Sequence, residues 1–162
     1  MSSNGEALPE PWQKRGRVLT GGLHAIGFGE GSDLALVVTH DGRGLIDCST
    51  GERVARDRTV IYPDERTFEI DGIGRLGGTK VATAGIDGGE LRHRTQDGWL
   101  LDGTLTNNSD DVILLVPPTQ ALASSQPAIF TGFIPEVRAF GFSPTGQSFL
   151  IATGAEVFVF AR

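Results

Sequence analysis

A hexapeptide that occurs twice constrains the fold of this chain more than any other feature. Residues 23–28 read LHAIGF and residues 137–142 read VRAFGF, so apolar, polar, alanine, glycine and phenylalanine positions follow in the same order. Each copy is followed by a turn of small residues, at 29–32 and at 143–146, and then by a run with high β propensity. A chain that repeats a strand, a turn and a second strand repeats a supersecondary unit, so we expect an all-β repeat fold.

The spacing of the predicted strands divides the chain into four such units. The two hexapeptides start 114 residues apart, which is three steps of about 38 residues and close to the ~40 residues of a four-stranded propeller blade. Short β-prone runs bounded by glycine-rich and Asp-Gly turns recur along the chain. They predict strands at residues 13–20, 23–28, 34–39, 44–48, 52–56, 67–70, 80–84, 90–94, 99–105, 112–116, 128–133, 137–142, 148–152 and 156–160.

The last unit has three predicted strands where a propeller blade has four. We therefore expect residues 13–20 to supply the missing outer strand, which would close a ring by pairing the N-terminus with the C-terminus. The predicted fold is a small four-unit β-propeller-like meander over residues 12–162, preceded by a disordered tail at residues 1–11. A two-sheet β-sandwich is the alternative, because short strands at this spacing also form sandwiches.

Two stretches of the chain carry a resemblance to a known repeat. Residues 137–146 (VRAFGFSPTG) are similar to the first strand and the Ser-Pro-Asp-Gly turn of the WD-repeat family of β-propellers. In the first unit, the Ile-Asp pair at 46–47 stands where that family has Trp-Asp, and residues 50–52 (TGE) stand where it has Thr-Gly-Lys. The resemblance covers two of the four units, about half of the chain, and implies a propeller fold. The chain also resembles short bacterial proteins with a Gly-Arg-Gly motif, here residues 42–44, and an Asp-Cys pair, here residues 47–48.

Composition and charge narrow the classes of partner. The chain has 162 residues, with 20 acidic side chains against 14 Lys and Arg, and a net charge of −6 at pH 7. A nucleic-acid binder needs clustered basic residues to neutralise phosphates, so we expect no nucleic-acid partner and instead a basic protein. The sequence has one cysteine, no apolar leader and no run long enough to cross a bilayer, so we expect a cytoplasmic protein without a membrane partner.

No motif in the sequence predicts catalysis, a cofactor or a metal. Residues 72–77 spell GxGxxG, but a strand is predicted after them where a dinucleotide site needs a helix. His24, His40, His93 and Cys48 are too scattered to share ligand spacing on one element. Cys48 ends an apolar strand without an activating base nearby, so we expect a buried thiol rather than a nucleophile. We therefore predict no catalytic residues, no cofactor and no metal site.

The loops of the predicted propeller supply the functional hypothesis. In such a fold the turns between the second and third strands share one rim with the connections between blades, and rims of rigid scaffolds present contacts. Eight mostly acidic side chains on that rim form the candidate partner-binding site: His40, Asp41, Arg43, Tyr62, Asp64, Glu65, Asp87 and Glu156. We hypothesise a non-enzymatic domain that binds one basic protein partner. A narrower version is an immunity protein or antitoxin that inhibits a basic toxin by direct binding.

Two alternative functions stay open at this point. A small-ligand binder or an enzyme would use a central propeller pocket in which polar groups converge. A structural subunit would assemble through an open strand edge, because an uncovered edge invites pairing with another chain.

Overall fold

The structure, a computed structural model, describes residues 8–104, 111–118, 128–132 and 137–162. Regular structure in these ranges is almost entirely antiparallel β-sheet, so the predicted all-β class is confirmed. The exception in that part of the chain is one short 3₁₀ turn, η1 (Gly74–Leu76), within the GxGxxG stretch.

The described strands form four sheets. The terminal sheet contains β1 (Gln13–Leu19), β14 (Glu156–Ala161), β13 (Ser148–Thr153) and β12 (Val137–Phe142), in that order. The meander sheet contains β5 (Glu52–Asp57), β4 (Gly42–Asp47), β3 (Leu34–Thr39), β2 (Leu23–Phe28) and β8 (Ala84–Gly85). The three-stranded sheet contains β11 (Ala128–Gly132), β10 (Asp111–Val116) and β9 (Leu100–Thr104), and β6 (Glu69–Asp71) forms a hairpin with β7 (Lys80–Ala82). Over the described residues, none of these sheets closes on itself.

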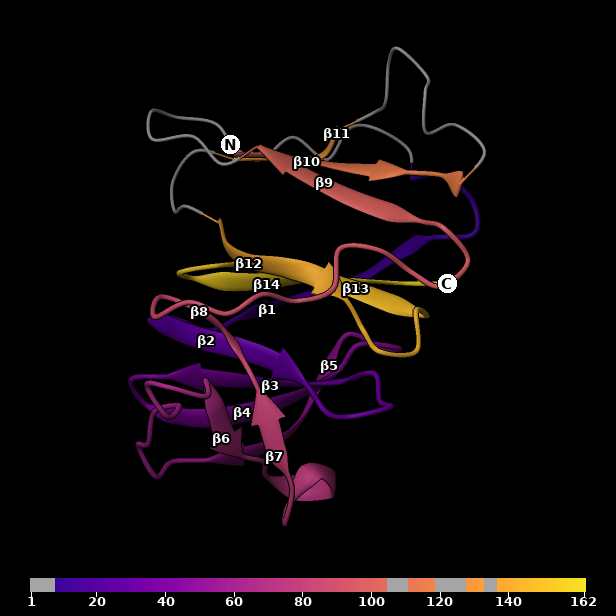
Figure 1. The fold of residues 1–162 in the computed structure, drawn as a ribbon. Coiled ribbons are helices and arrows are strands. Elements are labelled where there is room, and N and C mark those ends of the chain that lie inside the picture. The colour runs from indigo at the N-terminus through magenta and orange to yellow at the C-terminus, as the bar shows by residue number, and fades with distance from the viewer. Residues whose placement is uncertain (1–7, 105–110, 119–127, 133–136) are drawn as a thin grey trace.

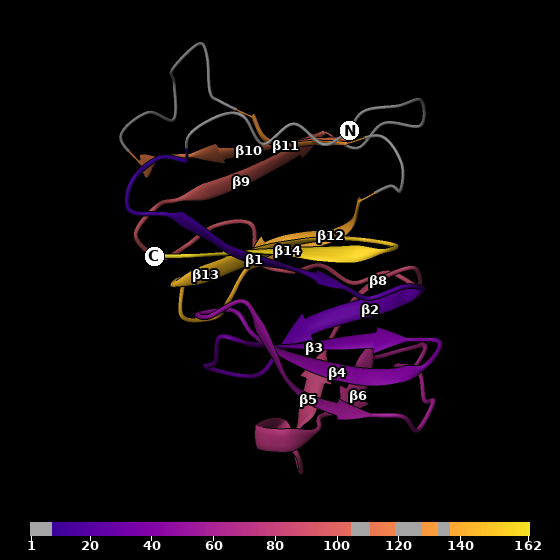
Figure 2. The same cartoon turned by 180° about the vertical axis from the view of Figure 1, so that it is seen from behind.

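The sheets stack in one column with apolar layers between them. From one end to the other the order is three-stranded sheet, terminal sheet, meander sheet and hairpin (Figure 1), and the view from behind shows the same order (Figure 2). Buried apolar side chains fill the three spaces between successive sheets. Representative members are Leu101 and Phe149 in the first layer, Ile26 and Leu150 in the second, and Leu36 and Val81 in the third.

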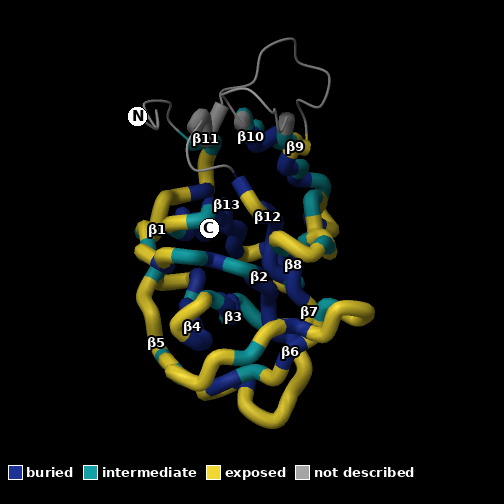
Figure 3. Tube along the Cα trace, turned by 90° about the vertical axis from the view of Figure 1, so that its left-hand side faces the viewer, coloured by how far each residue is buried: buried dark blue, intermediate teal, exposed yellow. Residues whose placement is uncertain are grey.

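The two inner sheets are covered on both faces, which explains the apolar composition of their strands. Along β13, Phe149 and Ile151 belong to the first layer, whereas Leu150 and Ala152 belong to the second. Successive side chains of a strand point to opposite faces, so a strand between two layers is apolar throughout. Figure 3 shows this burial along the inner strands, whereas β5 and the connections around the hairpin are largely exposed.

The repeated hexapeptide forms the same local structure in both places. In β2 and in β12 the register with the next strand shifts around the second residue, His24 in one copy and Arg138 in the other. Each copy therefore contains a β-bulge at the same position, and a bulge redirects the side chain that it leaves unpaired. The four residues after the bulge are buried in both copies.

The glycine at the fifth position of the hexapeptide serves the same purpose in both copies. A β carbon on Gly27 would overlap the carbonyl oxygen of Ala82, and one on Gly141 would overlap the β carbon of Leu91. The chain thus passes tightly against one repeat strand at the end of β7 and against the other in the connection from β8 to β9, where any side chain at these glycines would block it.

β1 joins the two ends of the chain, as predicted. It pairs antiparallel with β14 along its length and so completes a four-stranded sheet. Trp12, directly before β1, is 3% exposed, and its ring lies 5.7 Å from that of Trp99 and 5.0 Å from that of Phe149. Of the predicted tail, residues 1–7 lie outside the described residues, and Leu8 packs partly buried against the first apolar layer.

The predicted strands at residues 67–70, 80–84, 90–94 and 99–105 do not form one sheet, so their prediction as a single four-stranded unit is wrong. Its first two strands form the β6–β7 hairpin, and its last strand becomes β9 in the three-stranded sheet. Residues 90–94 form no strand and make isolated bridges, one to Phe142 of β12 and one to Leu100 of β9. The charged side chains of this segment are exposed, whereas Leu91 packs partly buried against the second apolar layer. The His93 ring stacks on the Phe140 ring, with the centroids 4.3 Å apart, so side-chain packing holds the segment where the prediction placed a strand.

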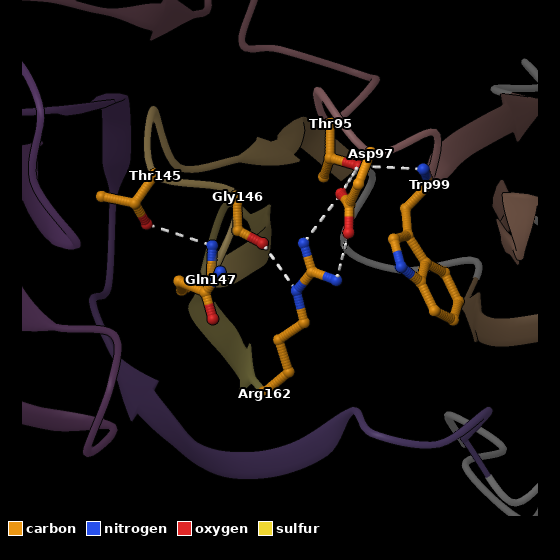
Figure 4. A network of polar contacts seen from close by, with 7 residues as sticks. All are labelled: Thr95, Asp97, Trp99, Thr145, Gly146, Gln147 and Arg162. Carbon is orange, nitrogen blue, oxygen red and sulfur yellow. Dashed lines mark hydrogen bonds and ion pairs between the residues drawn. The ribbon is translucent and has the colours of Figure 1, made fainter.

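A polar network ties the start of β9 to the end of β14 (Figure 4). The Arg162 guanidinium donates two hydrogen bonds to the Asp97 carboxylate, at 2.8 and 2.9 Å, and one to the Gly146 carbonyl at 2.9 Å. Thr95 Oγ1 donates to Asp97 at 2.7 Å and accepts the Trp99 backbone N–H at 2.8 Å. Because the guanidinium stabilises the charged carboxylate, it holds the pKa of Asp97 well below its ordinary value. The network fixes the three-stranded sheet against the terminal sheet.

Candidate functional site

Four side chains from separate parts of the chain meet beside the meander sheet. His24 lies at the bulge of β2, His40 between β3 and β4, Tyr62 after β5, and Asp87 after β8. His24 Nε2 lies 2.9 Å from Asp87 Oδ2, and His40 Nδ1 lies 3.1 Å from the Tyr62 hydroxyl oxygen. The centroid of the His24 ring is 4.8 Å from that of Tyr62 and 6.4 Å from that of His40. We call these four residues the rim cluster.

The turn between β3 and β4 positions His40. Thr39 Oγ1 accepts the backbone N–H of Asp41 at 3.1 Å and closes this turn. Gly22, with a φ of 77°, lies against the imidazole, because a β carbon there would be 2.7 Å from His40 Cδ2. His40 is thus held between its own turn and the end of the connection from β1.

The bulge of β2 and the turn after β8 position His24 and Asp87. β8 pairs with β2, and the backbone N–H of Ile86 donates to the His24 carbonyl at 3.0 Å. The bulge turns the His24 side chain toward the residue that follows Ile86, and this residue is Asp87. The hydrogen bond between His24 and Asp87 therefore depends on two backbone features that lie 63 residues apart in the sequence.

Exposed apolar side chains accompany the rim cluster. Tyr62 is 46% exposed, Ile86 is 53% exposed, and Val60, two residues before Tyr62, is 47% exposed. Asp41 and Asp87 stand next to His40 and Ile86 in the sequence and are both exposed. An exposed apolar centre with a charged border is typical of a surface that binds another molecule.

The turn at residues 64–67 extends this surface. Asp64 accepts two backbone N–H groups of its own turn at 2.7 and 3.1 Å, and these hydrogen bonds lower the pKa of its carboxyl group. Phe68 follows the turn, and its ring packs against Gly88, directly after Asp87. Asp64 and the exposed Glu65 are thereby connected to the rim cluster.

The last two of the eight predicted residues make their contacts outside the rim cluster. Arg43 is 8% exposed, donates from Nη1 to the Asp71 carbonyl at 2.6 Å and lies 3.5 Å from the Asp57 carboxylate. Glu156 forms an ion pair with Arg17 at 3.3 Å, across the pairing of β14 with β1. These contacts hold sheet edges together.

Sequence reasoning missed two residues of this surface, His24 and Ile86. His24 has one signal in the sequence: it is the polar residue within an otherwise apolar repeat. The other copy has Arg138 at this position, which donates a hydrogen bond to the Leu23 carbonyl. The bulge position thus carries a polar contact in both copies, although its partner differs.

Among the described residues, no three His, Cys, Asp or Glu side chains are grouped so that they could hold a metal ion. Cys48 is fully buried, and burial raises the pKa of its thiol far above the ordinary value, so the thiol stays protonated. The rim cluster offers aromatic faces, imidazole nitrogens and carboxylates, which are groups suited to contact and hydrogen bonding.

A scan against protein-family models finds no match, and a search of curated proteins finds no significant relative. Across the part of the chain that the structure describes, no helix has the length and apolar character needed to cross a membrane.

Proposed function

We propose that this protein is a non-enzymatic domain that binds one basic protein partner through the rim cluster and its acidic border. The observation that carries the proposal is the exposed Tyr62, in contact with His24 and His40 and near the exposed Ile86. A tyrosine offers a large contact area at a low cost in conformational entropy. Aromatic anchors of this kind dominate the binding energy of many protein interfaces.

The border of the surface sets the charge of the partner. Asp41, Asp64, Glu65 and Asp87 are exposed around Tyr62, and the whole chain carries a net charge of −6. Such a border attracts a basic surface within a Debye length of about 8 Å at physiological ionic strength and speeds association. The association rate is therefore expected to fall as salt is added.

For the scaffold, we infer a propeller-like relation among the four sheets, with the terminal and meander sheets as neighbouring units. The common bulge and the common glycine crossing in β2 and β12 support this relation, because they make the two strands equivalent. The completion of the terminal sheet by β1 also supports it, since both chain ends then belong to one unit. The loops beside the bulge of β2 then form a rim on a rigid support.

The narrower form of the proposal is an immunity protein or antitoxin that inhibits a basic toxin. This activity needs no catalysis from the chain, because a surface of fixed shape and charge inhibits by covering the partner's own site. The expected result is a partner that is toxic when expressed alone and harmless when co-expressed with this protein.

Affinity capture from the native host, with the full chain as bait, tests the proposal. The wild-type chain is expected to recover one basic protein in stoichiometric amount. Tyr62→Ala should weaken binding at least about tenfold, because an interface anchor is lost. Val54→Ala is the matched control, since Val54 is an apolar side chain on β5 that is 44% exposed and lies outside the rim cluster.

Two outcomes would contradict the proposal. One is the absence of any stoichiometric partner in captures with the wild-type chain. The other is a partner that binds the Tyr62→Ala variant as tightly as it binds the wild-type chain.

A further inference from the structure

A pocket of about 140 Å³ lies where the end of β1 meets one face of the meander sheet. Thr20 and Gly21 line it from the β1 side, and Gly44, Arg53 and Arg56 line it from β4 and β5. We propose that this pocket binds a tetrahedral oxyanion, the phosphate group of a small phosphorylated ligand. The site is separate from the rim cluster, and the inference does not depend on the protein-binding function.

A bulge in β5 places two arginines on the same face of the sheet. Arg56 lies opposite Gly44, but Arg53 lies opposite Ile46, because the register shifts between these pairs. Residues three apart in a regular strand point to opposite faces, whereas the extra residue of a bulge brings them to one face. Ile46 belongs to the apolar layer that faces the terminal sheet, so both arginines are directed to that side.

Gly44 leaves the space between the arginines and β3 unfilled. A β carbon on Gly44 would meet the Arg53 Nε at 3.6 Å, in ordinary contact distance. Any longer side chain at this position would extend into the pocket. The hollow is therefore a consequence of a glycine that stands beside Arg56 in the pairing of β4 with β5.

Arg53 and Arg56 both have N–H groups that donate no hydrogen bond within the described part of the chain. Nη2 of Arg53 donates to the Leu19 carbonyl at 2.8 Å, which orients the guanidinium and leaves its other N–H groups available. Among the described residues, no hydrogen bond or ion pair engages the Arg56 side chain. A guanidinium without a partner in an acidic protein is a ready site for an anion.

A buried polar atom without a partner lies at the same pocket. Thr20 lines it and is 5% exposed. Its Oγ1 is one of the buried side-chain polar atoms that lack a hydrogen-bond partner among the described residues. An unsatisfied buried hydroxyl costs free energy, so its persistence at a pocket indicates a ligand that it contacts.

The charge and geometry of the donors favour phosphate over carboxylate. The lining includes one carboxylate, on Asp41, and the Arg43 guanidinium is already paired with Asp57, so Arg53 and Arg56 supply the free positive charge. Two guanidinium groups balance a dianion. Donors on β5 and a hydroxyl at the end of β1 approach from different sides, which suits the four oxygens of a tetrahedral ion better than the two of a planar one.

Titration of the full chain with inorganic phosphate at constant ionic strength, followed by calorimetry or by amide chemical shifts, tests the inference. Saturable binding is expected, with the largest shifts at residues 19–21 and 53–56. Arg56→Gln should weaken it about tenfold or more, since a charge-assisted hydrogen bond is lost, and should fold normally because Arg56 has no partner to lose. Arg15→Gln removes the same charge at another exposed site and should leave phosphate binding unchanged.

Competing anions and a second variant test whether the pocket prefers a tetrahedral oxyanion and whether Thr20 contacts it. Sulfate and glycerol 3-phosphate should compete with inorganic phosphate, whereas acetate should not. Thr20→Val should weaken phosphate binding without lowering the melting temperature, because its hydroxyl has no protein partner. Absence of saturable phosphate binding, equal affinity for acetate, or unchanged affinity in Arg56→Gln would each overturn the inference.

Discussion

At the scale of single residues, the two repeat glycines and the two bulge residues have defined roles in the fold. Gly27 and Gly141 admit a crossing chain that any side chain would obstruct. The bulge residues His24 and Arg138 turn away from the apolar layers and make polar contacts near the ends of their strands. The short hexapeptide thus encodes both a core strand and the place where another segment passes over it.

Replacement of Gly141 tests the crossing directly. Gly141→Ala should destabilise the protein by about 1–3 kcal/mol, because the new methyl group overlaps Leu91 and the Arg92 backbone and forces them to shift. Urea unfolding followed by fluorescence measures the change. Gly21→Ala is the control: a β carbon there meets nothing within 4 Å, so its effect should stay within about 0.5 kcal/mol. Equal stability of the two variants would show that the crossing is not tight.

At the scale of elements, β1 has the largest influence on the rest of the chain. It covers the edge of β14, and it continues from Trp12, which is buried in the first apolar layer. Its far end reaches the meander sheet, where Arg53 binds the Leu19 carbonyl. One strand therefore completes the terminal sheet and closes one side of the pocket beside β5.

Removal of β1 should expose the edge of β14, which can then pair with a strand of another molecule. A chain of residues 20–162 is expected to lose much of its stability and to self-associate through β14, because an uncovered edge pairs with other strands. A synthetic peptide of residues 8–19 should restore the monomer and raise the melting temperature. Sedimentation and thermal unfolding measure both effects, and a scrambled peptide serves as the control. A stable monomer without the peptide would contradict this role of β1.

At the scale of the whole molecule, each of the two inner sheets of the column contributes to two of the three apolar layers. The terminal sheet contributes to the first and second layers, and the meander sheet to the second and third. The β6–β7 hairpin contributes to one layer only and lies at an end of the column (Figure 1). Stability is therefore expected to be shared in the middle and local at the hairpin.

Two side-chain truncations, one in the second layer and one in the third, test this distribution of stability. Leu150→Ala in the second layer should lower the global free energy of unfolding by about 2–5 kcal/mol and speed amide exchange in both inner sheets. Val81→Ala in the third layer should speed exchange mainly in β6 and β7. Hydrogen exchange resolved by residue measures both patterns. Uniform acceleration by Val81→Ala would mean that the hairpin unfolds together with the column.

The strand positions, the repeat and the pairing of β1 with β14 could be predicted from the sequence. Each rests on a local property: alternating or continuous apolar runs, glycine-rich turns, and a unit that lacked one strand. Six of the eight predicted partner-binding residues belong to, or adjoin, one surface, because turns and connections are visible in the sequence. The outward position of His40 and Tyr62 follows from such turns.

Tertiary structure alone decided which sheet each strand joins and which side chains meet. Residues 90–94 alternate like a strand, yet they form no strand and lie against β12 as a connection, because this packing depends on the space that the distant Gly141 leaves. The bulge of β2 directs His24 toward Asp87. The bulge of β5 places Arg53 on the same face as Arg56. A bulge changes the face of every residue beyond it. Periodicity in the sequence therefore determines that a strand forms, whereas long-range packing determines where its side chains act.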